Sequence, residues 1–308
     1  MIACDAVSLS YDGVRDAVSD LQLTVAAGSI FALVGPNGAG KTSTLRMLAT
    51  LTQPSRGTIR IDGLDAARDL EGVRRRVGYL PDNFALYDQM TPVDYLDFFG
   101  RAYEVDDTTR KRRIDALLEE FDLTQKRGST VRALSRGMRQ RLGLAKTLMH
   151  DPKVLLLDEP ASALDPGARM KLKEALLRLK ARGLSIIISS HILPDLAGLA
   201  DAVGIMEGGR LIRAGAIDTI ATARVTYVLC VRGAVDKALR VFADFGPRLR
   251  GQREVSPGRF EVDLDGGADV VAELVEALVL RGARLSEVAP RESAIEAVYR
   301  QSAASEVA

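Results

Sequence analysis

The stretch SIFALVGPNGAGKT, from Ser29 to Thr42, decides the fold of this chain. Its first half is a nearly continuous apolar run, which is typical of a β-strand buried on both faces. Its second half, GPNGAGKT, has the glycine and lysine spacing of the P-loop. Glycines let consecutive backbone N–H groups turn inward around an anion, and a helix that starts at the loop adds the positive end of its dipole. The stretch therefore predicts an α/β core that binds phosphate.

The residues of this loop indicate how a triphosphate and its cation would be held. Lys41 can reach the β- and γ-phosphates, the Thr42 hydroxyl can bind Mg²⁺, and Ser43 can donate to a phosphate. A tight strand-to-helix turn that merely contains a lysine is the alternative, but a helical pattern over residues 45–51 lies where the motif requires it. We expect ATP and Mg²⁺ as ligands, with further nucleotide contacts from Gly35, Pro36, Asn37, Gly38, Ala39 and Gly40.

Two adjacent acids end another apolar run, KVLLLDEP at residues 153–160. The carboxyl ends of strands are where an α/β sheet presents residues to a ligand, and two acids there would be costly without a cation. We expect Asp158 to enter the Mg²⁺ shell, directly or through water. Glu159 is expected to orient and deprotonate the attacking water. A solvated strand end is the alternative, and the P-loop upstream argues against it.

A histidine ends the next apolar strand, IIISSH at residues 186–191. Taken alone, a histidine in this place is more often a packed residue with satisfied hydrogen bonds. Beside a P-loop and two acids, His191 is expected to hydrogen-bond the γ-phosphate and to take part in catalysis.

The order of the remaining elements indicates the layers of the core. Strands are predicted at residues 3–11, 21–28 and 57–63, helices at 91–103, 114–123, after Ser135 and at 169–183, and a hairpin at 203–215. Thr91 and Pro92 have the residue types of a helix start, and Gly208-Gly209 those of a hairpin turn. Buried strands that alternate with helices favour a largely parallel sheet covered on both faces.

The pattern changes after about residue 220. From there strands and helices follow in the order βαββαβ, at residues 225–231, 234–245, 248–256, 258–264, 268–282 and 283–289, and a last helix is predicted at 292–303. This order is that of the ferredoxin-like α+β arrangement. We expect one domain at residues 1–220 and an accessory domain at 221–308.

Taken together, the motifs of residues 1–220 resemble those of the ATP-binding-cassette ATPases. LSRGM at residues 134–138 looks like the signature sequence of that family, SALD at 162–165 like the loop that links two protomers, and YLPD at 79–82 like its glutamine loop. Tyr11 lies where the family has an aromatic that stacks on adenine, although packing alone is the alternative for it. The resemblance implies a P-loop NTPase core with an antiparallel β subdomain and an α-helical subdomain at about residues 84–150.

The resemblance also implies a dimer. In this family two cassettes pair head to tail, and each ATP lies between the P-loop of one copy and the signature helix of the other. Ser135, Arg136 and Gly137 would then hold the γ-phosphate in trans, and Asp165 would contribute to the nucleotide site. Because the chain has one P-loop and one signature, a second copy of itself is the simplest partner.

Two departures from the family pattern stand out. Arg136-Gly137-Met138 replaces the usual Gly-Gly-Gln, and Asp82 replaces the usual Gln. Anion binding at the signature should survive, since the serine, one glycine and the helix amides remain. Asp82 can still accept from water or meet Mg²⁺, and we expect it to tune coupling without abolishing turnover.

Aromatic residues between Tyr79 and Tyr103 point to a protein partner. Seven of them crowd this region of a chain that has only seven Tyr, eight Phe and no Trp, and aromatics are enriched at interface anchors. Each one taken separately favours the helical core. The family places a cytoplasmic helix of the membrane subunit here, so we expect Phe84, Tyr87 and their neighbours to dock a separate transmembrane permease.

Bulk composition narrows the class. A net charge of +1 over 308 residues gives no general attraction to nucleic acid, so no nucleic-acid partner is expected. The longest uncharged apolar stretch, residues 183–194, is too short to span a bilayer, and no signal peptide is evident. Two cysteines and two histidines fit no metal spacing. We expect a cytoplasmic protein that lies peripherally on the cytoplasmic face of the membrane when assembled with its permease.

The leading interpretation is the ATP-hydrolysing subunit of an exporter for a drug, antibiotic or other small molecule, because GYLPD, the signature region and the appended domain look most like cassettes of that kind. A soluble cassette acting on ribosomes or DNA is the alternative; a second P-loop with a charged linker, or inserted coiled coils or zinc sites, would mark it. A non-hydrolysing regulatory cassette is a third class, and Glu159 argues against it. The accessory domain could steady the dimer or contact the permease.

Overall fold

The computed structural model describes residues 2–162, 164–217, 225–266 and 268–291. It divides into two compact units, Met1–Ala214 and Gly215–Ala308, and each is described by itself. The boundary expected at residue 220 and the helix expected at 292–303 lie outside the described residues.

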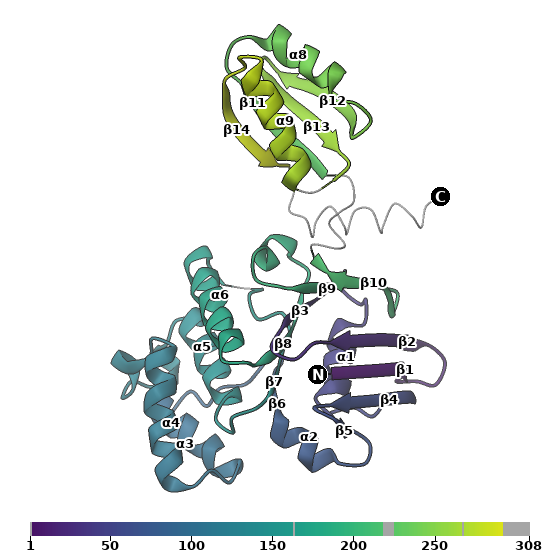
Figure 1. Cartoon of the computed structure of the whole chain (residues 1–308). Coiled ribbons are helices and arrows are strands. Elements are labelled where there is room, and N and C mark those ends of the chain that lie inside the picture. Colours follow the sequence, from purple (N-terminus) through teal and green to yellow (C-terminus); the bar gives the residue numbers. More distant parts are fainter. Residues whose placement is uncertain (1, 163, 218–224, 267, 292–308) are drawn as a thin grey trace. The chain divides into compact units, whose positions relative to one another are not determined.

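A six-stranded sheet with a parallel centre organises the first unit (Figure 1). Its strand order is β10-β9-β3-β8-β7-β6. The strands are β3 (Ile30–Val34), β6 (Val77–Leu80), β7 (Val154–Leu157), β8 (Ser185–Ser190), β9 (Ala202–Glu207) and β10 (Arg210–Ala216). β3, β7 and β8 are buried along their whole length, which explains the apolar runs in their sequences. The P-loop leaves the carboxyl end of β3, between β8 and β9.

The first unit also contains a second sheet, which is antiparallel. It has the order β2-β1-β4-β5, formed by β1 (Ile2–Ser10), β2 (Asp16–Val25), β4 (Arg56–Ile61) and β5 (Leu64–Asp65). Helix α1 (Lys41–Leu48) contributes Leu45, Met47 and Leu48 to one core cluster with both sheets. The helix that starts at the P-loop is therefore held between two sheets, and the predicted antiparallel β subdomain is confirmed.

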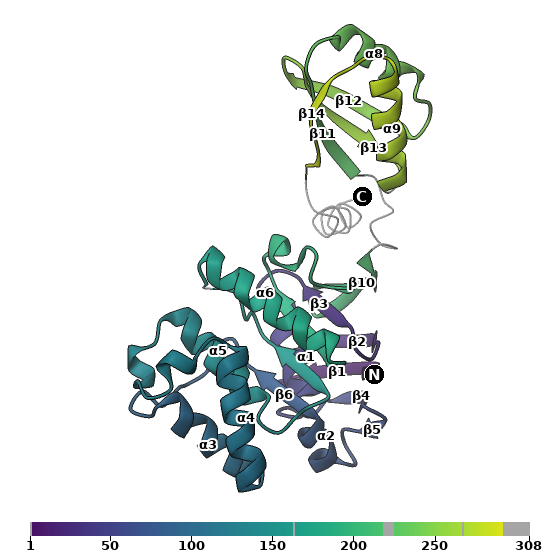
Figure 2. The ribbon, with the colours of Figure 1, turned by 60° about the vertical axis from the view of Figure 1, so that its left-hand side comes forward.

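Helices α3 (Pro92–Ala102), α4 (Asp107–Glu120) and α5 (Arg136–Thr147) form the helical part, beside α6 (Pro166–Ala181) (Figure 2). Thr91 caps α3 in a reciprocal capping box with Asp94. Short 3₁₀ turns lie at Thr124–Lys126 (η1), Val131–Ala133 (η2) and Leu193–Leu196 (η3). The helical subdomain expected from the family resemblance is thus present. Helix α2 (Leu70–Arg76) and strand β6 were not predicted, because their sequences are short and the helix is mostly charged.

The second unit has the order β11 (Val225–Val231), α8 (Val235–Asp244), β12 (Leu249–Ser256), β13 (Arg259–Leu264), α9 (Ala268–Leu280) and β14 (Leu285–Pro290). Its strands lie in the antiparallel order β12-β13-β11-β14. Phe242 of α8 and Phe260 of β13 meet edge to face at 5.3 Å in its core. The sheet order confirms the predicted ferredoxin-like arrangement.

Candidate functional site

The P-loop is glycine-rich because the protein backbone crowds it. A Cβ on Gly35 would lie 2.2 Å from the carbonyl oxygen of Met206, and one on Gly40 would lie 2.7 Å from that of Ala17. Gly40 also has φ of 101°, in the region that side chains disfavour. These close approaches fix the loop between β9 and β2, and α1 begins directly after it.

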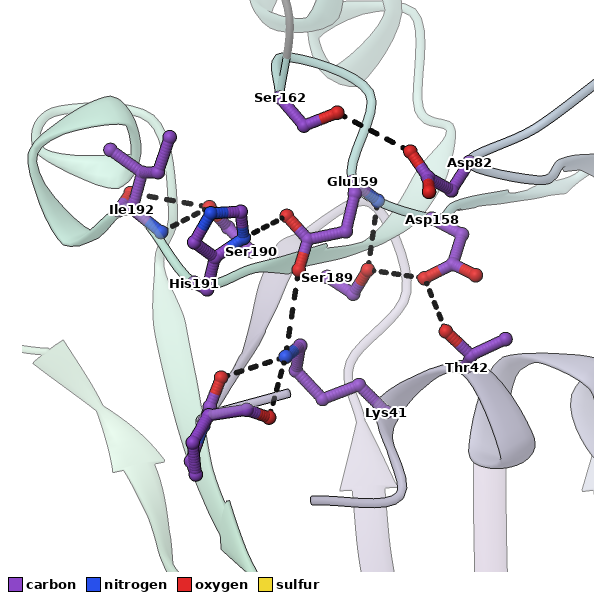
Figure 3. A network of polar contacts seen from close by, with 12 residues as sticks. Lys41, Thr42, Asp82, Asp158, Glu159, Ser162, Ser189, Ser190, His191 and Ile192 are labelled. Atoms are coloured by element: carbon purple, nitrogen blue, oxygen red, sulfur yellow. Dashed lines mark hydrogen bonds and ion pairs between the residues drawn. The ribbon is translucent and has the colours of Figure 1, made fainter. Parts of the chain in front are cut away.

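Lys41 is buried and reaches back over its own loop (Figure 3). Its Nζ donates to the carbonyl oxygens of Gly35 at 2.7 Å and Pro36 at 3.1 Å, and it lies 3.5 Å from Oε1 of Glu159. A buried ammonium needs such partners. The lysine is therefore positioned where phosphate oxygens could replace the two carbonyls.

Asp158 stands at the end of β7 with its side chain 1% exposed. Its Oδ1 accepts from the Thr42 hydroxyl at 3.1 Å and from Ser189 at 2.7 Å. Sequence reasoning missed Ser189. The signal lay in the strand register, because Leu157 pairs with Ile188 across β7 and β8, which sets the next residues, Asp158 and Ser189, side by side.

Glu159 and His191 form the second pair of the site. His191 Nδ1 lies 2.7 Å from Glu159 Oε2, and the backbone N–H of Glu159 donates to Ser189 at 2.9 Å. Glu159 has φ of 47°, an uncommon left-handed value for a residue with a side chain. Its carboxylate thus lies between the Lys41 ammonium and the imidazole, as Figure 3 shows.

Asp82 follows β6 and faces the same pocket. Its Oδ1 accepts from the Ser162 hydroxyl at 3.3 Å. The pocket over the P-loop is lined by Ala17, Asn37, Gly38, Ala39, Gly40, Lys41, Thr42, Ser43, Asp82 and Glu159. In β6, burial and then the Asp158 charge raise the pKa of Tyr79 to about 12, so this phenol stays neutral.

The donor set at the pocket suits a hard cation. A hydroxyl from Thr42 and carboxylates from Asp158 and Asp82 are oxygen ligands of the kind that Mg²⁺ takes together with phosphates. Among the described residues no three His, Cys, Asp or Glu side chains gather in a metal cluster. Thr42, Asp158 and Asp82 fit a Mg²⁺ ion that also takes oxygen ligands from phosphates.

Tyr11 lies beside this pocket, and its side chain is largely exposed to solvent. The residue is 59% exposed, and its hydroxyl donates to the Ser43 hydroxyl at 3.3 Å. The ring is thereby tethered next to the start of α1. A flat, exposed aromatic in this place can stack on a base.

The signature and linking residues lie elsewhere in the chain. Ser135 caps α5 by accepting from the N–H of Met138 at 3.3 Å, and Asp165 caps α6 by accepting from Ala168 at 3.0 Å. Arg136 is exposed, and a Cβ on Gly137 would lie 3.1 Å from that of Ala168. These four residues are absent from the lining of the P-loop pocket, so the chain's own fold does not bring them to it.

Comparison with known proteins places these motifs in context. The family model described as "ABC transporter" matches residues 18–162. The daunorubicin resistance ATP-binding protein DrrA3 of Streptomyces coeruleorubidus is 32% identical over 302 residues, covering 97% of this chain and 94% of that protein. The Nod factor export ATP-binding protein I of Ralstonia nicotianae is 40% identical over 203 residues, covering 66% of this chain and 63% of that protein.

Solved structures agree on the fold. The ATP-binding subunit of an ABC transporter superposes with a TM-score of 0.65 at 32% identity, covering 71% of this chain and 91% of that one. The ATP-binding cassette MJ0796, solved as a dimer with ADP and phosphate, has a TM-score of 0.63 at 22% identity, covering 70% and 98%. Within the described ranges, no helix has both the length and the apolar character needed to traverse a bilayer.

Proposed function

Since this chain belongs to the ATP-binding-cassette transporter family, we propose that it binds and hydrolyses ATP, paired with a second copy of itself, to power export through a separate membrane-spanning permease. The observation that carries the proposal is the line of contacts from Lys41 through Glu159 to His191, beside the Thr42–Asp158 pair.

Catalysis follows from the partners that these residues hold. When ATP enters, Lys41 Nζ exchanges the carbonyls of Gly35 and Pro36 for phosphate oxygens, which also weakens its ion pair with Glu159. Glu159 is then free to accept a proton from a water aimed at the γ-phosphorus. His191, on the other carboxylate oxygen, orients Glu159 and can donate toward the γ-phosphate.

Mg²⁺ would be held by Thr42 and Asp158, with Asp82 at the rim of the same pocket. When bound, it neutralises charge that develops on the phosphate oxygens. Ser189 keeps Asp158 oriented through its hydrogen bond to Oδ1.

A second copy completes the site in this proposal. Ser135, Arg136 and Gly137 lie at the exposed N-terminus of α5, away from their own P-loop. Free backbone N–H groups and the helix dipole make such a terminus a ligand for phosphate. In a head-to-tail pair they would meet the γ-phosphate held by the other copy.

Export is inferred from the relatives. Their names refer to daunorubicin resistance and Nod factor export, so a drug, antibiotic or other small molecule is the proposed cargo. The permease would seat on the exposed aromatics of α3 and the loop before it, since Tyr87 is 50% exposed and Phe98 44% exposed. Phe84, which we also expect there, is partly exposed and packs closely on Gly143. Through this contact the chain would lie on the cytoplasmic face of the membrane.

The decisive experiment compares wild type with Glu159→Gln, measuring ATP turnover and mass by light scattering with Mg²⁺ and ATP. We expect hydrolysis to fall by about a hundredfold or more, and the variant to accumulate as an ATP-bound dimer. Lys41→Ala is the control, and it should lose both nucleotide binding and dimer. Undiminished turnover by Glu159→Gln, or a strictly monomeric variant at saturating ATP, would refute the proposal.

A further inference from the structure

Arg169 joins the loop that contains Asp165 to the segment that follows His191. It lies in the first turn of α6, and its Nε donates to the carbonyl oxygen of Leu164 at 3.0 Å. Its Nη1 pairs with Oδ1 of Asp195 at 3.2 Å. Leu164 immediately precedes Asp165 in the linking loop, and Asp195 lies in η3, just beyond His191. One guanidinium therefore spans both segments.

This ion pair is unlike an ordinary surface pair. The Asp195 side chain is only 16% exposed, and its second oxygen, Oδ2, is buried without a hydrogen-bond partner among the described residues. A carboxylate in that position is unfavourable unless a cation stays beside it. Separation of Arg169 from Asp195 would therefore be costly in free energy. We expect a shift of the Leu164 loop to move the Asp195 segment with it.

A continuous path leads from this pair to the catalytic carboxylate. The N–H of Asp195 donates to the carbonyl of Ile192 at 3.2 Å, and the N–H of Ile192 donates to Ser190 at 3.0 Å. His191 lies between these two residues and contacts Glu159 Oε2 at 2.7 Å. The path therefore runs from the linking loop, through Arg169 and Asp195, to His191 and Glu159.

We propose that Arg169 and Asp195 are positioning residues that set His191 and Glu159 according to the state of the Asp165 loop. The inference rests on the proposed roles of Glu159 and His191. When a second copy presses on the Asp165 loop, Arg169 moves with Leu164 and carries Asp195, and this movement adjusts the contact that His191 makes with Glu159. Neither residue lines the pocket over the P-loop.

Helix capping is separate from this role. Asp165 caps α6 through the N–H of Ala168, and Arg169 takes no part in that bond. Replacement of Arg169 by lysine keeps the charge, but an ammonium lacks the planar fork that reaches Leu164 and Asp195 together. Arg169→Lys thus separates the double contact from simple charge.

The test measures kcat, KM and ATP-driven dimerisation for Arg169→Lys, Asp195→Asn and the double variant. We expect kcat to fall about tenfold or more, because small displacements of catalytic groups carry such losses, while KM stays within about twofold. The double variant should be no slower than the slower single one, since both changes break one link. Lys171→Gln is the matched control: it removes an exposed ion pair from the same helix and should leave kcat unchanged.

Further measurements keep the outcomes distinct. In a Glu159→Gln background, Arg169→Lys should still form the ATP-bound dimer, which separates positioning from a failure to assemble. Thermal unfolding shows whether a variant is merely unstable, and Asp195→Glu, which keeps the charge, should recover part of kcat. Wild-type kcat in both folded single variants would overturn this inference alone, whereas undiminished turnover by Glu159→Gln would overturn the proposed function.

Discussion

The P-loop region and the signature region of this chain differ in how many contacts their functional side chains make with one another. Around the P-loop, the functional side chains already hold one another: Lys41 contacts Glu159, and Thr42 contacts Asp158. At the start of α5 and α6, Ser135 and Asp165 only cap their own helices. The difference teaches that one region holds its functional side chains in mutual contact, whereas in the other they contact only their own helices. In the proposed head-to-tail pair, the second region would meet the nucleotide of the other copy.

The largest effect is expected from the P-loop region. Lys41→Met should reduce ATP binding below detection in equilibrium titrations, because it removes the buried ammonium and leaves Glu159 without its cation. Lys111→Met, an exposed lysine on α4, is the control and should bind ATP normally. Retained binding by Lys41→Met would erase the distinction between the two regions.

The next effect tests the signature region. Arg136→Glu places a negative charge at the exposed start of α5, and we expect turnover to fall about tenfold or more through repulsion of phosphate. ATP binding by the monomer should not change, since this residue is absent from the P-loop pocket. Lys111→Glu, an exposed reversal on α4, controls for net charge. Loss of monomer binding in Arg136→Glu would show that the two regions are not separate.

A smaller effect concerns the supports of the P-loop region. Ser189→Ala removes the donor to Asp158 and the acceptor for the Glu159 N–H. We expect about 1–3 kcal/mol less stability in denaturant unfolding, the range for a buried polar group left unpaired. Addition of ATP and Mg²⁺ should recover part of the loss by mass action. Ser190→Ala, in the same strand, leaves Asp158 untouched and should be stabilised by ATP and Mg²⁺ as much as the wild type, because mass action acts on every variant that keeps its affinity.

The smallest expected effect is a pH dependence of stability in the helical part of the chain. Burial lowers the pKa of His150, which follows α5 and whose Nε2 donates to the carbonyl oxygen of Val77 at 3.0 Å. A lowered folded-state pKa means that the unfolded chain binds the proton first. Stability should therefore be full above the ordinary histidine pKa of about 6.5 and decline as pH falls through and below it.

Hydrogen exchange would locate this decline. Between pH 7 and 5.5, amides near the end of α5 should lose protection before those of α1, and His150→Gln should remove the difference. Equal loss of protection in α1 and α5 would mean that acid destabilises the P-loop region and the helical part together.

A site residue could be predicted from the sequence when one short motif contains the whole signal for it. Lys41, Thr42 and the acids Asp158 and Glu159 belong to short motifs, so one stretch of chain carries the whole indication. Ser189 needs the pairing of β7 with β8, and Arg169 with Asp195 needs the approach of α6 to η3. Those contacts join segments 26 to 31 residues apart, and no local pattern encodes them. The capping roles of Ser135 and Asp165 are local, but the family resemblance drew attention to phosphate instead.

Glu159 occupies a backbone conformation that suits glycine or asparagine better, with φ of 47°. Keeping a glutamate there sacrifices roughly 1 kcal/mol of folding free energy. Glu159→Gly and Glu159→Asn would relieve this backbone strain, and they would also remove the carboxylate that contacts Lys41 and His191 and that turnover needs. A library selected only for thermal stability would therefore accept inactive variants at this position. Backbone strain and ATP turnover thus place opposite demands on a single residue.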